Sequence, residues 1–191
     1  MTGAIAGNMK EKKKMHPYKF NMWLAIAGII MFFAAFTSAY IVMHDRDSWQ
    51  SFKMPSIFLV STFLILVSSL TMHLALKRFK QHKMLAYRYL ITLTAVLGFL
   101  FLISQLYGFS VMYDTGLTLA WNNSTSFLYV IVMAHMAHVL GGVIALLFIF
   151  FRAYRRKVRT YDAVPVEIVS TYWHFVDVLW IYLYIFFLII G

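Results

Sequence analysis

The sequence has no cysteine and few charged residues. Without cysteine there can be no disulfide framework and no thiolate ligand for a metal. Charged residues make up 13% of the chain and hydrophobic residues 62%, against roughly 25% and 45–50% in soluble domains. A chain of 191 residues with a mean hydropathy of +0.74 carries too much apolar surface to bury in a water-soluble fold. The same numbers exclude a disordered chain.

Five apolar stretches are each long enough to cross a bilayer, which takes about 20 residues as a helix. They cover residues 20–43, 54–76, 89–113, 126–151 and 168–190. The first four contain no Asp, Glu, Lys or Arg, and the fifth contains only Asp177. The period-two alternation of a membrane β-barrel is missing. We therefore predict an all-α polytopic membrane protein, with a cytoplasmic basic N-terminal segment at 1–19 and a five-helix transmembrane bundle at 20–191.

The basic residues are divided unevenly between the two sides of the predicted bundle. Fifteen of the 17 lie before the first span or in the connections that follow the second and fourth spans, whereas Arg46 and Lys53 alone lie on the other side. Positive charge marks the cytoplasmic side. We expect a multi-pass protein of a bacterial inner membrane with its N-terminus cytoplasmic and its C-terminus external. The net charge of +10 then reflects topology and contact with anionic lipid, not binding of nucleic acid.

Placing a polar side chain inside a membrane span costs free energy, so we expect each such residue to have a structural or functional role. The candidates are His73, Gln105, His135, His138, His174 and Asp177. His135 and His138 are three residues apart, which places them on one helix face, and Gly141 and Gly142 follow where a neighbouring helix can approach closely. His174 and Asp177 have the same spacing, and we expect them to form a hydrogen-bonded pair.

Two interpretations of these histidines compete: they ligate a metal or haem, or they hold the bundle together through hydrogen bonds between helices. At about 1.5 Å per residue, His138 lies roughly 20 Å and His174 roughly 9 Å from the inner ends of their spans. That mismatch is too large for two axial ligands of one haem. His73, roughly 5 Å deep, could approach His174. We favour the structural role for the four residues His135, His138, His174 and Asp177, and predict no metal or catalytic residue in this chain.

Two segments resemble a known family. Residues 172–180, Tyr-Trp-His-Phe-Val-Asp-Val-Leu-Trp, are similar to the signature of subunit III of haem–copper terminal oxidases. The matching motif residues are Tyr172, Trp173, His174, Phe175 and Asp177. Residues 134–142 resemble the two-histidine segment of the same family, which runs into the glycines Gly141 and Gly142. The likeness extends over essentially the whole chain and matches the five-helix form, which lacks an additional N-terminal helix pair.

The resemblance implies a non-catalytic subunit of a proton-pumping cytochrome c oxidase of aerobic respiration. In this family haem and copper belong to subunits I and II, while subunit III packs against subunit I, holds phospholipid, and supports proton uptake and durable turnover. One position departs from the pattern. Many members carry a buried glutamate before the Phe-Phe-Ala run of the first of these helices, and Ile29 stands in its place here. A role that depends on that acid does not carry over.

Three alternatives stay open at this point. The chain is also similar to the five-helix subunit that accompanies nitric oxide reductase. A small b-type membrane cytochrome could use His73 and His174, and a proton-coupled transporter could use Asp177. The resemblance favours cytochrome c as electron donor of the complex, but the sequence itself identifies neither the donor nor the haem types nor the lipid species.

Overall fold

The computed structural model describes residues 16–44, 56–114, 123–154 and 162–190, which form five α-helices and contain no strand. The helices are α1 (Pro17–His44), α2 (Ile57–Lys80), α3 (Met84–Asp114), α4 (Asn123–Tyr154) and α5 (Val164–Ile190). Each is long and apolar enough to cross a membrane. The predicted fold class, an all-α bundle of five membrane-spanning helices, is confirmed. Most of the segment 1–19 lies outside the described residues, so the division of the chain at residue 20 stays a prediction.

The helices run beyond the predicted spans, most clearly at the start of α3. The predicted span begins at residue 89, whereas α3 begins at Met84. Arg88 lies within this helix, and its Nε donates a 2.8 Å hydrogen bond to the carbonyl of Ala153, close to the end of α4. Hydropathy locates the apolar part of a helix and not its backbone ends. How much of each helix lies in the membrane stays a prediction.

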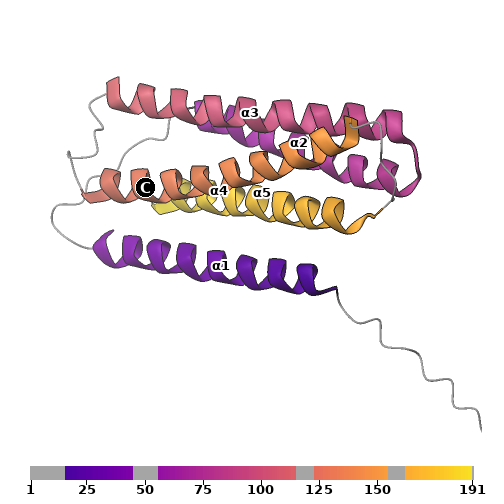
Figure 1. Ribbon diagram of the computed structural model, residues 1–191. Coiled ribbons are helices and arrows are strands. Elements are labelled where there is room, and N and C mark those ends of the chain that lie inside the picture. Colours follow the sequence, from indigo (N-terminus) through magenta and orange to yellow (C-terminus); the bar gives the residue numbers. More distant parts are fainter. Residues whose placement is uncertain (1–15, 45–55, 115–122, 155–161, 191) are drawn as a thin grey trace, which may run out of the picture.

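The helices form three layers (Figure 1). α4 and α5 make the middle layer, with α2 and α3 on one side and α1 on the other. Within the described residues α1 contacts α4 and α5 but neither α2 nor α3. The core therefore lies in the middle layer, where α4 touches α1, α3 and α5, and α5 touches α1, α2 and α4.

A tight turn joins α2 to α3. The backbone N–H of His82 bonds to the carbonyl of Phe79, and the N–H of Lys83 bonds to the carbonyl of Arg78. This pair of bonds is a Schellman motif, in which one residue must adopt the left-handed conformation. His82 does so with a φ of 58°, at a position where glycine is usual. The turn sets α2 and α3 side by side as a hairpin.

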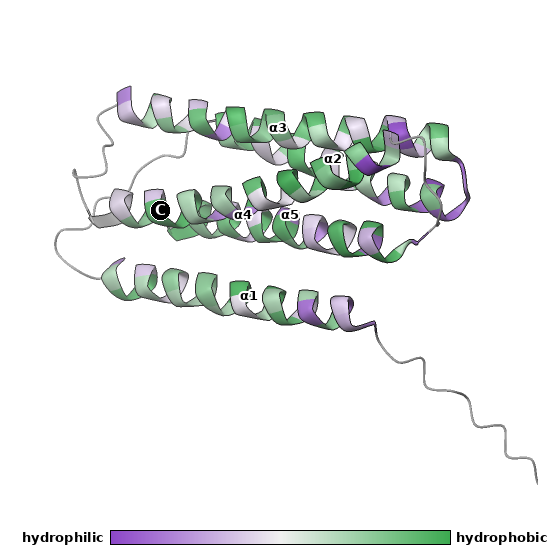
Figure 2. Ribbon diagram, viewed as in Figure 1, coloured by the Kyte–Doolittle hydropathy of each residue, from purple (hydrophilic) through white to green (hydrophobic). Residues whose placement is uncertain are grey.

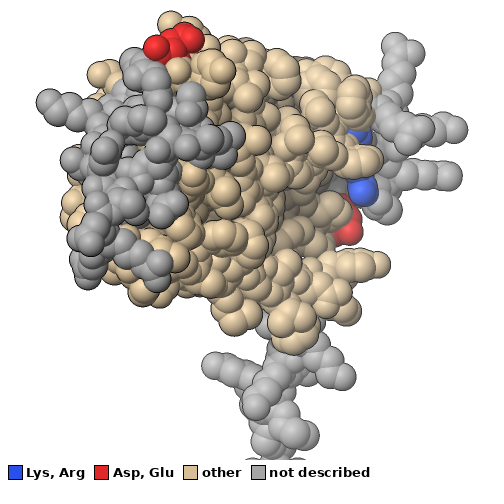
Figure 3. Space-filling view, turned by 90° about the vertical axis from the view of Figure 1, so that its left-hand side faces the viewer, with Lys and Arg blue, Asp and Glu red and all other residues tan. Residues whose placement is uncertain are grey.

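The outer surface is apolar along the length of the helices. Figure 2 shows hydrophobic residues along all five helices, with strongly hydrophilic ones mainly toward their ends and at the α2–α3 turn. On the face seen in Figure 3, charged side chains of the described residues lie at the edges of an otherwise uncharged surface. Large apolar side chains such as Phe148 and Ile189 are about three-quarters exposed, at 74% and 75%. Such a surface suits lipid and not water, so the chain is a multi-pass membrane protein.

Candidate functional site

The indole of Trp173 joins α5 to three other helices. Its Nε1 donates a 3.0 Å hydrogen bond to Ser68 Oγ on α2. One edge of the ring lies against Gly98 on α3, where an added Cβ would come 2.6 Å from Cη2, and another lies against Gly142 on α4, at 3.1 Å from Cε3. Trp173 is almost fully buried. The two glycines thus leave the room that the indole occupies, and the ring fixes the distance between α3, α4 and α5.

His174 bonds to α2 and not to its neighbour on α5. Its Nδ1 lies 2.7 Å from Ser69 Oγ, in a hydrogen bond between helices. Its ring centroid is 6.2 Å from that of His73, which is exposed on α2. The expected hydrogen bond between His174 and Asp177 is therefore wrong. A spacing of three residues places two side chains on one helix face, but the neighbouring helix decides which of its groups each one meets.

Asp177 is buried without a hydrogen bond. Its side chain is 2% exposed, and neither carboxyl oxygen has a hydrogen-bond partner among the described residues. Ser69, which bonds to His174, also lies near the carboxyl, but its contact with the carboxyl does not meet hydrogen-bond geometry. Asp177 sits between Trp173 and Trp180 along α5, and both indoles donate hydrogen bonds to hydroxyls of α2. The carboxyl therefore faces the α2 side of the core.

The two histidines of α4 both lie near Phe33 of α1. The ring centroid of Phe33 is 6.3 Å from that of His135 and 5.5 Å from that of His138. His135 is fully buried and stacks on Trp180 at 5.2 Å, and neither ring nitrogen has a hydrogen-bond partner among the described residues. His138 lies 2.7 Å through Nδ1 from the carbonyl of Ala134 in its own helix. The prediction that they share a face agrees with these contacts, but the expected hydrogen bonds to other helices are wrong.

The remaining motif residues join α5 to α4 or pack at the core. The hydroxyl of Tyr172 donates a 3.0 Å hydrogen bond to the carbonyl of His138. That hydroxyl would also lie 3.9 Å from a Cβ added at Gly141. Phe175 is partly buried and packs against the buried core, as does Ile29 on α1. The contacts of Tyr172 and Phe175 in the structure are thus a hydrogen bond between helices and packing against the core.

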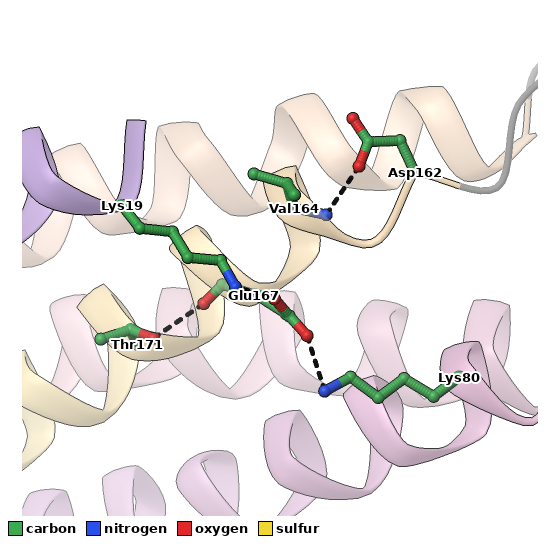
Figure 4. Close-up of polar contacts among 6 residues, drawn as sticks. All are labelled: Lys19, Lys80, Asp162, Val164, Glu167 and Thr171. Carbon is green, nitrogen blue, oxygen red and sulfur yellow. Dashed lines mark hydrogen bonds and ion pairs between the residues drawn. The ribbon is translucent and has the colours of Figure 1, made fainter. Parts of the chain in front are cut away.

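A second polar site lies at the end of the bundle where α1 begins and α2 ends. Glu167, in the first turn of α5, pairs with Lys19 of α1 through one carboxylate oxygen and with Lys80 of α2 through the other at 2.6 Å. Figure 4 shows the two lysines reaching the carboxylate from opposite sides. Asp162 Oδ1 accepts a 3.0 Å hydrogen bond from the Val164 N–H and so caps α5. The ion cluster ties together helices that do not otherwise meet, since α1 and α2 have no contact.

Sequence reasoning missed this cluster and several packing residues. Glu167 lies just before the predicted fifth span, where an acid in the first helical turn is favoured by the helix dipole. A sequence signal was present, because only three acids, Glu11, Asp162 and Glu167, lie on the predicted side that holds fifteen basic residues. Gly98 and Ser69 gave no signal, since a glycine or serine inside an apolar helix is common. Gln105 was noted as a candidate, and it is fully buried with both amide atoms lacking a hydrogen-bond partner among the described residues.

These sites do not gather the side chains that redox metals need. Among the described residues, no three His, Cys, Asp or Glu side chains lie close enough to hold a metal ion. The geometry instead provides buried aromatic packing, hydrogen bonds between helices and one cluster of charges at an end of the bundle.

Comparisons with a family model and with individual proteins all match this chain to subunit III of oxidases. The family model "Cytochrome c oxidase subunit III" matches residues 3–191. The chain is 29% identical over 167 residues to cytochrome c oxidase subunit 3 of Bacillus sp. (strain PS3), an alignment that covers 85% of this chain and 80% of the relative. It is 27% identical over 172 residues to the probable quinol oxidase subunit 3 of Staphylococcus aureus (strain USA300), covering 87% of this chain and 85% of that relative.

Proposed function

Because the chain belongs to the cytochrome c oxidase subunit III family, we propose that it packs beside the catalytic subunit I of a bacterial respiratory oxidase and supports its turnover without binding haem or copper. Subunits I and II are the proposed protein partners, and they carry the haem and copper. The relatives include subunits of both cytochrome c and quinol oxidases, so either electron donor fits the chain. We propose cytochrome c as the electron donor of the complex, as the resemblance implies.

The arrangement of Trp173 is the observation that carries this proposal. The most distinctive residue of the family-like segment is used to set the spacing of α3, α4 and α5 and to bond α2. A residue that served a cofactor would leave a polar atom or a ring face open to it. Trp173 leaves neither, because its one donor is bonded and its ring is enclosed. The arrangement of Trp173 therefore supports a structural role for this chain in the oxidase.

Support of proton uptake and retention of lipid are the finer parts of the proposal. Basic side chains gather at the end of the bundle that holds the α2–α3 turn, among them Lys77, Arg78, Lys80 and Lys83. Such charge attracts anionic lipid and raises the local concentration of anions at the membrane surface. Since Ile29 offers no carboxylate on α1, the support comes from packing and lipid and not from an acid in that helix.

The proposed orientation puts this basic end in the cytoplasm. It rests on the fifteen-to-two division of Lys and Arg between the sides. Topology reporters fused at Lys80 should report the cytoplasm, and a reporter at Asp114, at the far end of α3, should report the external side. A cytoplasmic signal at Asp114 would reverse the proposed arrangement.

The functional experiment compares the purified oxidase with and without this chain. Initial rates of oxygen consumption should be similar near neutral pH, because electron transfer does not pass through a chain that carries no redox centre. Activity should decay faster over many turnovers in the depleted complex. Immediate loss of all activity, with subunits I and II still assembled and fully metallated, would mean that the chain takes part in the reaction itself.

Two other assignments have specific tests. The approach of His73 and His174 to 6.2 Å is the observation that favours a b-type cytochrome, since two imidazoles on one metal lie at a comparable separation. A Soret band and stoichiometric iron in the purified full chain would establish it; we expect neither. Identification of the co-purifying catalytic subunit separates an oxidase from a nitric oxide reductase.

A further inference from the structure

The carboxyl of Asp177 lies in the core without a group of opposite charge beside it. Its side chain is 2% exposed, and neither oxygen accepts a hydrogen bond from the described residues. The apolar spans 20–43, 54–76 and 126–151 of the three helices that pack on α5 contain no Lys or Arg. An ionised carboxylate in such surroundings is so unfavourable that the group takes up a proton and stays neutral. The position therefore favours a carboxyl that carries an O–H donor.

Ser69 and His174 lie next to this carboxyl and can accept its proton. Ser69 lies near the carboxyl, and its Oγ is 2.7 Å from Nδ1 of His174. A hydroxyl can donate one proton while it accepts another, and a neutral imidazole accepts at one nitrogen while it holds a proton on the other. His174 is half-buried, so its ring lies between the core and the surface. A proton that enters at Nδ1 can leave from Nε2 on the other side of the ring.

His73 of α2 continues this polar row to the surface. Its ring is exposed, and its centroid is 6.2 Å from that of His174. Toward the basic end of the bundle a groove of about 360 Å³ follows, lined by Leu76 and Thr171, which lie three residues from His73 and His174 respectively. The ion cluster of Glu167 lines the same groove, and its partly exposed charges attract water. The row thus leads from the core to water at this end.

The row does not continue past Asp177 toward the other end of the bundle. On α4, His135 stacks on Trp180, and neither of its ring nitrogens has a hydrogen-bond partner among the described residues. His138 lies against a carbonyl of its own helix. On α1 the span 20–43 carries no Asp, Glu, Lys, Arg or His, and its Tyr40 packs near the far end of α5. A row that is open at one end can hold a proton but cannot carry protons across the membrane.

We propose that Asp177 binds one proton and exchanges it with water at the basic end of the bundle. The route runs through Ser69, His174 and His73. The carboxyl O–H gives its proton to Ser69 Oγ while Ser69 gives its own to Nδ1 of His174, and Nε2 of His174 releases a proton toward His73 and water. The carboxylate that remains takes up a proton by the same route in reverse, so no other reactant is needed. The inference goes beyond the proposed function, because every group in the row belongs to this chain.

The proton on Asp177 is tested by infrared spectroscopy of the purified full chain in lipid nanodiscs near neutral pH. A protonated carboxyl has a carbonyl stretch that an ionised carboxylate lacks. The chain has 7 Asp and Glu residues, and all except Asp177 lie outside the predicted spans, where they are ionised at this pH. The band should be present in the wild-type chain and absent from Asp177→Asn, which keeps the shape of the side chain. A wild-type chain with full helix content and no such band would overturn the site.

The route is tested by transfer of the same sample into D₂O, which shifts the band as deuterium replaces the proton. His174→Phe should slow this shift about a hundred-fold, the lower end of what a positioned proton-transfer group contributes. A variant that only loosened the bundle would speed the shift, since water would then reach the carboxyl. His138→Phe is the matched control, because His138 is also half-buried but lies outside the row, and it should leave the rate unchanged. An unchanged rate with His174→Phe, or equal slowing by both variants, would overturn the route.

A third variant tests the outer end of the row. His73→Ala should also slow the shift, and imidazole added to the solution should restore the rate, because the position of His73 is exposed. Imidazole should not restore the rate of His174→Phe, where the ring of phenylalanine fills the site. A rate that is unaffected by His73→Ala, or slowed and not restored by imidazole, would contradict the part proposed for His73.

Discussion

Gly98 of α3 and Trp173 of α5 are in such close contact that a single added carbon would overlap them. A Cβ at Gly98 would lie 2.6 Å from Cη2 and 2.9 Å from Cζ2 of the indole. The indole cannot retreat easily, because it is bonded to Ser68 and rests on Gly142 on its other side. The helices of this bundle are thus spaced by a large ring set between two residues without side chains.

Gly98→Ala should destabilise the bundle by about 1–3 kcal/mol, the usual cost of overpacking a core. The measurement is thermal unfolding of the full chain in detergent, followed by circular dichroism. Gly28→Ala is the matched control, since a Cβ there meets nothing within 4 Å. It should be neutral or slightly stabilising because alanine favours a helix over glycine. Equal melting temperatures for the two variants would contradict the packing described.

His82→Gly should stabilise the α2–α3 turn by up to about 1 kcal/mol, because glycine adopts the left-handed conformation without the steric cost that His82 bears. Gln81, the preceding residue, has a φ of −85° and needs no glycine. Gln81→Gly should therefore lower stability in the same unfolding assay. A loss of stability with His82→Gly would contradict this prediction. It would show that the side chain of His82 stabilises the turn by more than its left-handed backbone conformation costs.

Gln105→Met should leave stability unchanged or raise it. The amide of Gln105 is buried with no hydrogen-bond partner among the described residues, so its removal relieves a desolvation cost and keeps the volume. Ser68→Ala is the contrasting variant, because it deletes the acceptor of the Trp173 N–H. It should cost about 0.6 kcal/mol or more, the mean for a hydrogen bond between membrane helices. The two melting shifts should have opposite signs, or the Gln105 shift should be near zero.

Ser69→Ala should alter the imidazole of His174 more than Asp177→Ala does. The Nδ1 of His174 is bonded to Ser69, and Asp177 makes no hydrogen bond with it. The readout is the ¹⁵N chemical shift of His174 in selectively labelled protein. A large shift with Asp177→Ala and none with Ser69→Ala would restore the pairing expected from the sequence.

The number and kind of the secondary-structure elements could be predicted from the sequence, because each helix that crosses a bilayer needs a continuous run of apolar residues. A continuous apolar run such as 126–151 is expected to be a helix, since a helix satisfies all its backbone hydrogen bonds within the segment itself. The same reasoning placed His135 and His138 on one face. It failed for His174 and Asp177 because the group that His174 meets, Ser69, lies 105 residues away on another helix.

The charged site at the end of the bundle was predictable only in part. The division of basic residues placed Lys19 and Lys80 on one side of the membrane, yet nothing in their spacing says that both meet Glu167. That meeting depends on α5 lying between α1 and α2, which is a property of three-dimensional packing. Hydropathy has no information about the order of helices around a bundle.

Because α1 contacts neither α2 nor α3 within the described residues, the helices cannot pack in the order in which they are synthesised. α2 and α3 can pair as a hairpin as soon as both have been synthesised, whereas the partners of α1, α4 and α5, emerge only after that hairpin. Lys19 must wait for Glu167, 148 residues later, which at about 5–20 residues per second takes roughly 7–30 s. Until α4 and α5 have emerged, α1 lacks its helix contacts and can be reached by an insertase or by another subunit. Assembly of the complex can therefore begin on α1 before the bundle has closed.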